Sequence, residues 1–406
     1  MTKTIALMGA LDTKGMEYAF VKKQIETHGL QTLVIDVGVL EPPRLEPDIS
    51  REEVARADGV ALDDLVNRRD RGGAVAAMSR GAAALLPRLF SEGRFHGVLA
   101  LGGSGGTSVA CAAMRALPLG VPKVMVSTVA GGDVSGYVGV RDIVMIPSIV
   151  DVAGINAISR EIFARAAGAV CGMVETDVPE GQDRPLIAAS MFGNTTLAVE
   201  AARTILEAAG YEVLVFHCTG AGGRTMESLV ESGRIAGVLD ITTTEWADEL
   251  VGGVMAAGPA RLDAAARHGV PAVVAPGCLD MVNFGAPDTV PARFAGRRFY
   301  PHNPNVTLLR TDIDENRRLG AILAEKLNLS VGPVTLVLPL QGVSMIDAPE
   351  GPFWWPEADR ALYDTLRERL RPDIPVIEMD CNINAPEFAQ RCAEVLLQEM
   401  GARRTS

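Results

Sequence analysis

The sequence predicts an α/β protein of two Rossmann-like domains with parallel sheets, related by internal duplication and with a ligand cleft between them. Three observations predict this fold class. The chain has 406 residues, more than the roughly 250 residues that one hydrophobic core usually holds. Hydrophobic residues make up 48% of it and aromatic residues 5%, which is typical of helices packed on buried parallel strands. Segments of the first half also recur, in the same order, in the second half.

Three pairs of segments carry the internal similarity. The paired segments are residues 3–38 and 185–220, 93–101 and 233–241, and 119–128 and 268–277. The first pair shares a pattern of apolar strand, polar turn, amphipathic helix and second strand, which any α/β protein repeats. The other two pairs share the short sequence motifs GR..GVL and GVP, which a common architecture does not explain. We therefore predict a duplication.

The polar segment VPEGQDRP at residues 178–185 marks a domain boundary, because Pro and Gly stand there directly before the second copy begins. We expect a nucleotide-binding domain at residues 1–182 and a second domain at residues 183–406. Ligands of parallel sheets bind at the carboxyl ends of the strands. Residues 334–347 suit a further strand and loop, and residues 386–400 a closing helix; both can belong to either half.

Composition excludes several function classes. The formal net charge of −12 and the pI near 5.0 oppose a broad contact with nucleic acid or an anionic membrane, since both are held by clustered Lys and Arg. The N-terminus lacks the pattern of a signal peptide, so we expect a cytoplasmic protein. Six dispersed cysteines and five histidines favour neither a zinc ribbon nor a disulfide framework. The expected partner is a small molecule, and a homo-oligomer stays open.

A glycine loop gives the strongest signal of a ligand. It joins an apolar strand at residues 97–101 to an Ala-rich helix and consists of Gly102, Gly103, Ser104, Gly105, Gly106 and Thr107. Glycine lets the backbone approach an anion, and the helix N-terminus offers free N–H groups and a partial positive charge. The loop fits neither the GxxxxGK[ST] nor the GxGxxG spacing. We expect the loop to bind a phosphate group. The alternative is a tight turn that binds no ligand.

Three other loops of the first half lie at expected strand ends. Lys14 is placed to reach a phosphate and Asp12 a metal ion, although Asp12 or Thr13 equally suits a helix cap. Asp36 ends the second strand, where an acidic side chain accepts hydrogen bonds from ribose hydroxyls or simply opens a turn. The remaining loop places Thr128, Gly131 and Gly132 at the same edge of the expected sheet.

The equivalent loops of the second half are polar instead of glycine-rich, so we expect any chemistry there. The candidate acid, base and carboxylate-pairing groups are Glu245, His302 and Arg310. The residues expected to contact a substrate are Gly222, Gly223, Arg224, Thr243, Thr244, Cys278 and Asn283. Each is weak alone, since threonines also cap helices and a cysteine is more often buried than nucleophilic. The segment that ends in Trp354 and Trp355 suits a lid, an oligomer contact or a hydrophobic staple.

Four motifs together resemble one family. GALDTKG (9–15), LGGSGGTS (101–108), GVPKVMVSTVAGGD (120–133) and PGCLDMVNFG (276–285) are similar to the ATP-binding domain family named after the tomato mosaic virus resistance protein, which also occurs in bacterial proteins of unassigned function. The resemblance implies a two-domain Rossmann-like fold and binding of ATP, with Mg²⁺, through Gly102 to Thr107 and the Asp12-Thr13-Lys14 turn. It supplies neither a reaction nor catalytic residues.

We expect a nucleotide-binding protein of cytoplasmic small-molecule metabolism. One alternative is a lyase or hydrolase that acts on a small polar, carboxylated metabolite in the cleft. Another is a regulatory protein whose nucleotide only stabilises the fold. A dehydrogenase is disfavoured, because a dinucleotide fingerprint is missing.

Overall fold

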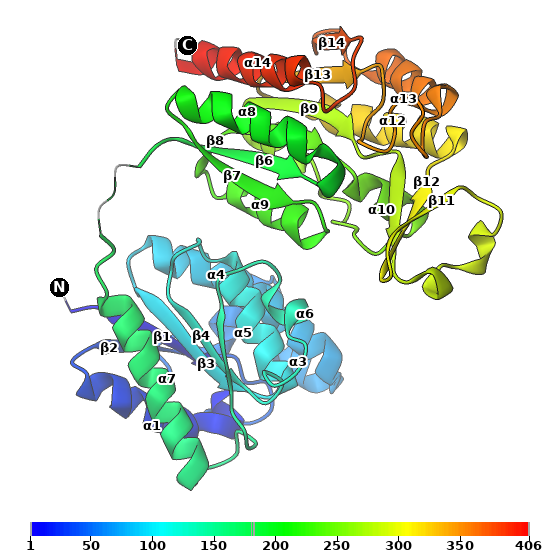
Figure 1. Ribbon diagram of the computed structural model, residues 1–406. Coiled ribbons are helices and arrows are strands. Elements are labelled where there is room, and N and C mark those ends of the chain that lie inside the picture. The colour runs from blue at the N-terminus through cyan, green and yellow to red at the C-terminus, as the bar shows by residue number, and fades with distance from the viewer. Residues whose placement is uncertain (1, 180, 182, 405–406) are drawn as a thin grey trace. The chain divides into compact units, whose positions relative to one another are not determined.

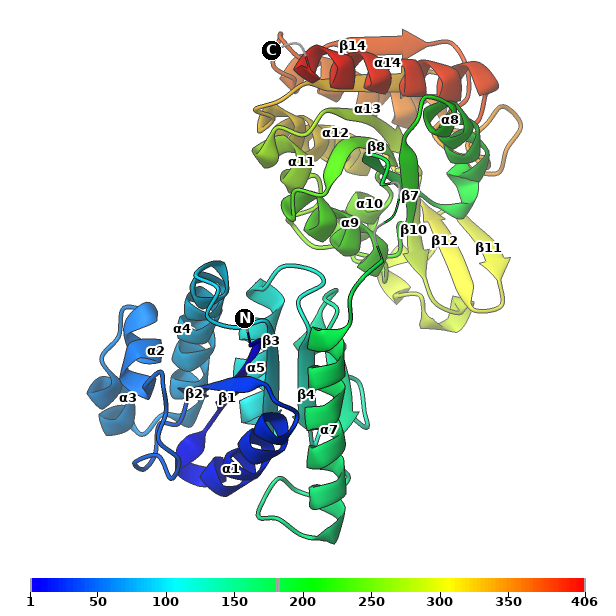
Figure 2. The same cartoon turned by 90° about the vertical axis from the view of Figure 1, so that its left-hand side faces the viewer.

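The protein divides into two compact units, Met1–Glu180 and Gly181–Ser406, each with its own parallel sheet. The structure is a computed structural model that describes residues 2–179, 181 and 183–404. Figure 1 and, turned by 90°, Figure 2 show helices on both faces of each sheet. The predicted α/β class with parallel sheets is therefore confirmed.

The first unit holds a five-stranded parallel sheet in the order β2-β1-β3-β4-β5. Its strands are β1 Thr4–Gly9, β2 Gln31–Asp36, β3 Gly97–Gly102, β4 Lys123–Ser127 and β5 Val144–Pro147. Its helices are α1 Leu11–Thr27, α2 Arg51–Ala57, α3 Leu62–Arg68, α4 Arg71–Ser91, α5 Ser104–Ala116, α6 Ser135–Val138 and α7 Ala157–Glu175. Successive strand residues point to opposite faces. Ile5 accordingly packs with α1 and α7, and Ala6 with α4 and α5.

The second unit holds a six-stranded parallel sheet, β14-β13-β9-β8-β6-β7, and a small antiparallel sheet, β10-β12-β11. The strands are β6 Leu186–Met191, β7 Glu212–His217, β8 Ile235–Thr242, β9 Ala272–Gly277, β10 Met281–Phe284, β11 Phe299–Asn303, β12 Val306–Arg310, β13 Val334–Pro339 and β14 Val376–Met379. The helices are α8 Thr196–Ala208, α9 Ala221–Glu231, α10 Glu245–Val251, α11 Asp263–His268, α12 Ile313–Asn328, α13 Pro356–Arg369 and α14 Pro386–Arg404. The helices α8 and α14 cover one face of the parallel sheet, and α9, α11, α12 and α13 the other.

Two features extend or correct the sequence analysis. The last strands and helices, left open between the halves, belong to the second unit, because β13 pairs with β9 in parallel. The polar loops expected at 276–285 and 302–312 instead contribute β10 and β12, which pair antiparallel. These strands have four and five residues, too few for a period-two pattern to stand out.

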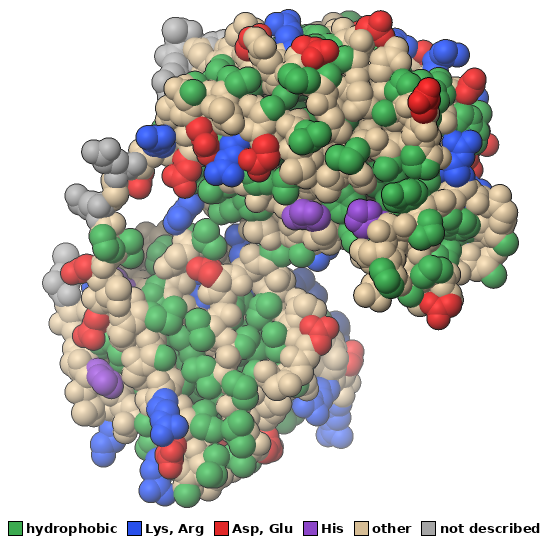
Figure 3. Space-filling model, in the orientation of Figure 1, with side chains coloured by type: hydrophobic (Ala, Val, Ile, Leu, Met, Phe, Trp, Pro, Cys, Tyr) green, Lys and Arg blue, Asp and Glu red, His purple; other side chains and the backbone are tan. Residues whose placement is uncertain are grey.

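The surface matches the charge balance of the sequence. On the face drawn in Figure 3, Lys and Arg side chains are scattered among Asp and Glu instead of forming one basic patch. Within the described residues, no helix is both long enough and apolar enough to cross a bilayer.

Packing of α4 on α2 yields a first testable prediction. A Cβ built on Gly81 of α4 would lie 2.1 Å from the Val54 carbonyl oxygen of α2, so Gly81→Ala must push the helices apart. We expect a loss of about 1–3 kcal/mol of unfolding free energy, the usual cost of overpacking. Urea denaturation of the full chain, followed by circular dichroism, measures it.

Gly172→Ala on α7 is the matched control. No heavy atom lies within 4 Å of its added Cβ, so we expect a gain of up to about 1 kcal/mol from helix propensity. Equal effects of the two substitutions would contradict the packing argument.

Candidate functional site

The glycine loop opens helix α5 at the carboxyl end of β3. The helix begins at Ser104, its N-cap is Gly103, and no side chain caps it. The first N–H groups of an α-helix lack intrahelical acceptors, and here they belong to Ser104, Gly105 and Gly106. Ser104 is exposed and both glycines are half-buried. The loop therefore presents backbone donors at its surface.

Packing does not require two of these glycines. A Cβ on Gly105 would meet Val75 at 3.7 Å, and one on Gly106 the Leu101 carbonyl at 3.7 Å, both ordinary contacts. A Cβ on Gly102 would have less room, because it would lie 3.1 Å from Gly106 Cα. The Thr107 hydroxyl is turned inward, where it hydrogen-bonds Ser127 Oγ at 2.6 Å.

Asp12 and Asp36 lie at the same edge of the sheet: Asp12 is in the first turn of α1, which follows β1, and Asp36 is the last residue of β2. Asp36 Oδ1 accepts from the N–H groups of Leu11 at 3.0 Å and Gly38 at 2.8 Å. Asp12 Oδ2 accepts from Leu40 N at 2.9 Å. The second oxygen of each carboxylate is buried and has no hydrogen-bond partner. Burial raises the pKa of Asp36, and the nearby Asp12 charge adds to the shift.

The first turn does not form the predicted helix cap. Helix α1 begins at Leu11 with Ala10 as an N-cap that makes no side-chain hydrogen bond, so the interpretation of Asp12 or Thr13 as N-cap is wrong. The hydroxyl of Thr13 is bonded to the Ala10 carbonyl at 3.4 Å. The ammonium group of Lys14 donates a hydrogen bond to the Val152 carbonyl. In this conformation Lys14 holds the loop after β5.

The third loop of the first unit stays accessible. Thr128 N donates to the Gly102 carbonyl at 3.2 Å, and Gly132 N donates to Val129 at 3.1 Å. Thr128, Gly131 and Gly132 are all exposed. The structure thus brings this loop directly against the glycine loop.

In the second unit, Glu245 belongs to a buried ion-pair cluster. Its Oε2 accepts from Arg261 Nε at 2.7 Å, and Arg261 also donates to Asp240 Oδ1 at 2.7 Å and Glu227 Oε1 at 3.2 Å. Glu245 and Arg261 are each about 1% exposed. Both carboxylate oxygens of Glu245 are paired and buried, so Glu245 is not available as an acid or base in this conformation.

The same carboxylate fills the anion site expected at Gly222 and Gly223. Glu245 Oε1 accepts from the backbone N–H groups of Gly220 at 2.7 Å and Gly223 at 3.1 Å, at the start of α9. Added Cβ atoms would lie 2.0 Å from Glu245 at Gly223 and 1.9 Å from the His217 carbonyl at Gly222. These glycines serve internal packing, while the exposed Arg224 donates to the Ala256 carbonyl at 3.0 Å.

Four other predicted substrate contacts are buried. The Thr243 hydroxyl donates to the Ala275 carbonyl at 3.2 Å, and the Asn283 amide donates to Asp248 Oδ2 at 2.8 Å. The Thr244 hydroxyl has no partner. Cys278 is fully buried at φ 59°, and burial raises the pKa of its thiol well above the ordinary value. A buried neutral thiol is not a nucleophile.

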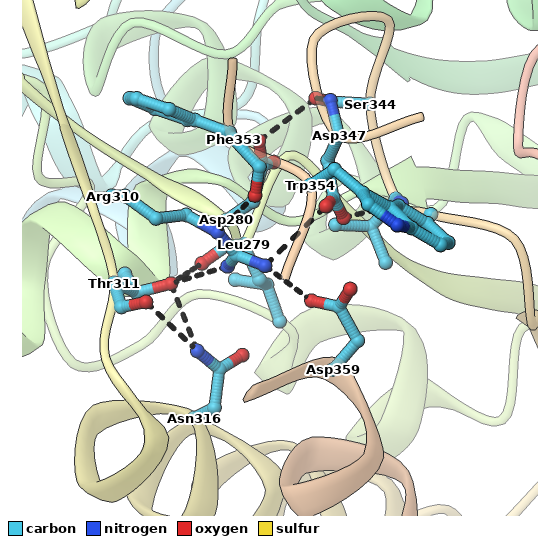
Figure 4. Close-up of polar contacts among 12 residues, drawn as sticks. Leu279, Asp280, Arg310, Thr311, Asn316, Ser344, Asp347, Phe353, Trp354 and Asp359 are labelled. Atoms are coloured by element: carbon cyan, nitrogen blue, oxygen red, sulfur yellow. Dashed lines mark hydrogen bonds and ion pairs between the residues drawn. The ribbon is translucent and has the colours of Figure 1, made fainter. Parts of the chain in front are cut away.

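Arg310 is buried, whereas His302 is exposed to solvent. Arg310 is 1% exposed and donates to the Phe353 carbonyl at 2.8 Å and to Asp359 at 2.6 Å, as Figure 4 shows. His302 is an exposed residue of β11. Arg310 therefore stabilises the protein's own carboxyl groups, and the structure does not unite it with Glu245 in one site.

Sequence reasoning missed the groups that complete these clusters. They are Glu227, Asp240, Arg261, Asp347 and Asp359. No local pattern marks them, because their ion-pair partners are 16 to 49 positions away. Among the described residues, no group of three or more His, Cys, Asp or Glu side chains is arranged to hold a metal ion.

The Arg261 cluster provides a second testable prediction. Arg261→Met leaves Asp240 and Glu245 buried without their cation, so we expect a loss of about 3–5 kcal/mol of unfolding free energy. Arg267→Met, which removes a mostly exposed guanidinium from α11, should change it by no more than about 0.5 kcal/mol. Urea denaturation distinguishes them, and similar small losses would show that the cluster is not structural.

Comparisons with known proteins agree along the whole chain. A UPF0261 protein of Clostridium tetani is 52% identical over 402 residues, which cover 98% of this chain and 100% of that protein. The ToMV resistance protein Tm-1(GCR237) of Solanum lycopersicum is 43% identical over 336 residues, which cover 81% of this chain and 45% of that protein. The expected kinship with the tomato protein is confirmed.

Solved structures add little. A putative UDP-N-acetylglucosamine 2-epimerase from Listeria monocytogenes aligns with 68% of this chain and 79% of its own at 13% identity. Its TM-score of 0.24 is too low to carry an argument. Family models, in contrast, match the N-terminal domain of the uncharacterised protein family UPF0261 at residues 3–179 and the C-terminal domain at residues 184–400. The chain therefore belongs to the family UPF0261.

Proposed function

We propose that the first unit binds a nucleotide, ATP with Mg²⁺, with its phosphates at the N-terminus of α5. The observation that carries the proposal is the glycine loop: its first-turn N–H groups are uncapped, and packing does not demand Gly105 or Gly106. An uncapped helix N-terminus stabilises a phosphate through its N–H groups and its dipole.

The unpartnered oxygens of Asp12 and Asp36 fit the rest of such a ligand. Mg²⁺ is usually bound by one or two carboxylates together with substrate phosphates, and Asp12 is the acidic group that we assign to it. Asp36 would accept from ribose hydroxyls, with one oxygen already fixed by backbone N–H groups. Bound Mg²⁺ would offset phosphate charge. Further contacts would come from Thr13, Thr128, Gly131 and Gly132, and from Lys14 once it leaves the Val152 carbonyl.

Strand order supports the proposed duplication and the Rossmann-like character of both units. The first sheet runs β2-β1-β3-β4-β5, and the second repeats that order with β7-β6-β8-β9-β13-β14. This is the doubly wound order in which ligands bind at the carboxyl ends of the strands. In the second copy Glu245 stands at the start of α10, where the first copy has Ser104 at the start of α5. A buried carboxylate there repels a phosphate, which favours the first unit.

The lyase or hydrolase alternative has weaker support. Glu245 and Arg310 are bound to internal partners and are about 1% exposed, so neither faces a substrate in this conformation. A nucleotide with a binding or regulatory role is compatible with all the contacts described above.

Isothermal titration of the full chain with ATP and Mg²⁺ tests the proposal. Gly105→Asp places a carboxylate in the first turn of α5, where it supports the helix dipole by about 0.3–1 kcal/mol but repels phosphate. We expect the fold to persist and affinity to fall at least about tenfold, which is 1.4 kcal/mol.

Gly105→Ala separates charge from size. Its methyl group meets only Val75, at 3.7 Å, so the free protein should gain up to about 1 kcal/mol from helix propensity. Affinity should fall less than in Gly105→Asp. Absence of binding heat in the wild type, or equal binding by wild type and Gly105→Asp, would overturn the proposal.

A further inference from the structure

A segment of the second unit crosses the carboxyl end of its parallel sheet. We call residues 340–355, between β13 and α13, the strap. Phe353 inserts from the strap into a buried apolar cluster with Cys278, Met281 and Leu308. The strap thus covers the edge of the sheet at which ligands of parallel sheets bind.

One carboxyl group ties both ends of the strap. Asp347 Oδ2 accepts from Val343 N at 3.0 Å, and the same carboxyl accepts from the backbone of Trp355. Arg310 of β12 donates to the strap at the Phe353 carbonyl, at 2.8 Å, and to Asp347 at 3.4 Å. Figure 4 shows Arg310 among these groups, with Asp359 approaching from α13. Asp347 and Arg310 therefore help to fasten the strap, together with Arg298, which donates to the Trp354 carbonyl at 3.1 Å.

The charges around Arg310 do not balance. Three buried carboxyl groups face this one guanidinium: Asp347 and Asp359 pair with it, and Asp280 accepts from Ser344 of the strap at 2.8 Å. The exposed fractions of Asp280, Asp347 and Asp359 are 0%, 0% and 3%. Asp280 Oδ1 and Asp359 Oδ2 are buried without a hydrogen-bond partner. Two surplus negative charges in such surroundings cost several kcal/mol each. A cation or two protons must compensate them.

The Arg261 cluster is a useful comparison, because its carboxyl groups have more hydrogen-bond donors. It also has three carboxylates on one guanidinium, but backbone N–H groups supply additional donors, two to Glu245 and two to Glu227. Around Arg310 the backbone serves only Asp347. Since no described carboxyl group is arranged with others as a metal site, protons are the simplest compensation.

Protonation agrees with the contacts. Burial raises the pKa of Asp359 to about 7, although Arg310 opposes the shift, and the touching Asp347 carboxyl raises it further. Burial likewise raises the pKa of Asp280 and Asp347. The other titratable groups that face the cluster are Cys278 beside Asp280 and Tyr363 of α13. Burial holds the pKa of each well above its ordinary value, so both are neutral near pH 7.

We propose that Asp280, Arg310, Asp347 and Asp359 form a proton-dependent latch that fastens the strap over the carboxyl edge of the second sheet. With a shared proton, Asp359 and Asp347 attract each other beside Arg310. Loss of that proton leaves two carboxylates in contact, and their repulsion frees the strap. Opening uncovers Cys278 and the buried hydroxyl pair of Thr195 and Thr242, which lie 2.8 Å apart.

Tryptophan fluorescence reports the latch directly, because Trp354 and Trp355 lie in the strap. Trp246→Phe removes the remaining tryptophan, which packs in the core with Lys326 over its ring. In this background, acrylamide quenching should rise severalfold between pH 5.5 and 8.5 with a midpoint near pH 7. Far-UV circular dichroism should stay constant, since only the strap moves.

Asp359→Asn is the decisive variant. An amide at this position accepts from Arg310 and donates to Asp347 as the protonated acid does, but it cannot ionise, so quenching should stay low throughout. Asp364→Asn, an exposed acid on the same helix, should keep the wild-type midpoint. A flat wild-type profile, an unchanged transition in Asp359→Asn, or a parallel loss of circular dichroism would overturn the latch. None of these results depends on whether the first unit binds a nucleotide.

Discussion

The unpaired N–H groups at helix N-termini are the constraint on which both units depend. A parallel sheet with helical crossovers points the strand carboxyl ends and the following helix N-termini to one edge, so positive helix ends collect there. The second unit supplies its own anion, because Glu245 accepts two N–H groups at the start of α9 and is neutralised by Arg261. The first unit leaves α5 uncapped. The two edges have the same architecture, but in the second unit a side-chain carboxylate occupies the helix end.

The buried Glu245 carboxylate requires particular residues around it. Glu245 fits only because position 223 is glycine, and its charge requires Arg261, which in turn brings Asp240 and Glu227 into the core. Backbone N–H groups supply two further donors to Glu245 and two to Glu227. The Arg310 cluster has the same ratio of acids to guanidinium with fewer donors. The number of donors, not the number of ion pairs, separates a permanent structural cluster from one that responds to pH.

Sequence predicted the parts that local pattern encodes. The apolar runs and glycine turns identify β1 to β4, β6 to β9 and β13, and Gly102 to Thr107 stand where α5 begins. It gave the wrong N-cap for α1, since Ala10 carries no side-chain signal. It also could not distinguish a catalytic from a structural role for Glu245 and Arg310. Both roles place polar residues at strand ends, and the deciding partners, such as Asp359, lie up to 49 positions away.

The cost of the glycines is the strongest physical reason to expect a ligand in the first unit. Glycine inside a helix is about 1 kcal/mol less favourable than alanine, and α5 begins with two of them in its first turn. In the second unit packing requires Gly222 and Gly223, because any side chain there would collide with His217 or Glu245. Gly105 and Gly106 have no such neighbour: each would accept a methyl group at 3.7 Å. A turn that served packing alone would be more stable with alanine at both positions, so the space that these glycines leave supports the proposed ligand.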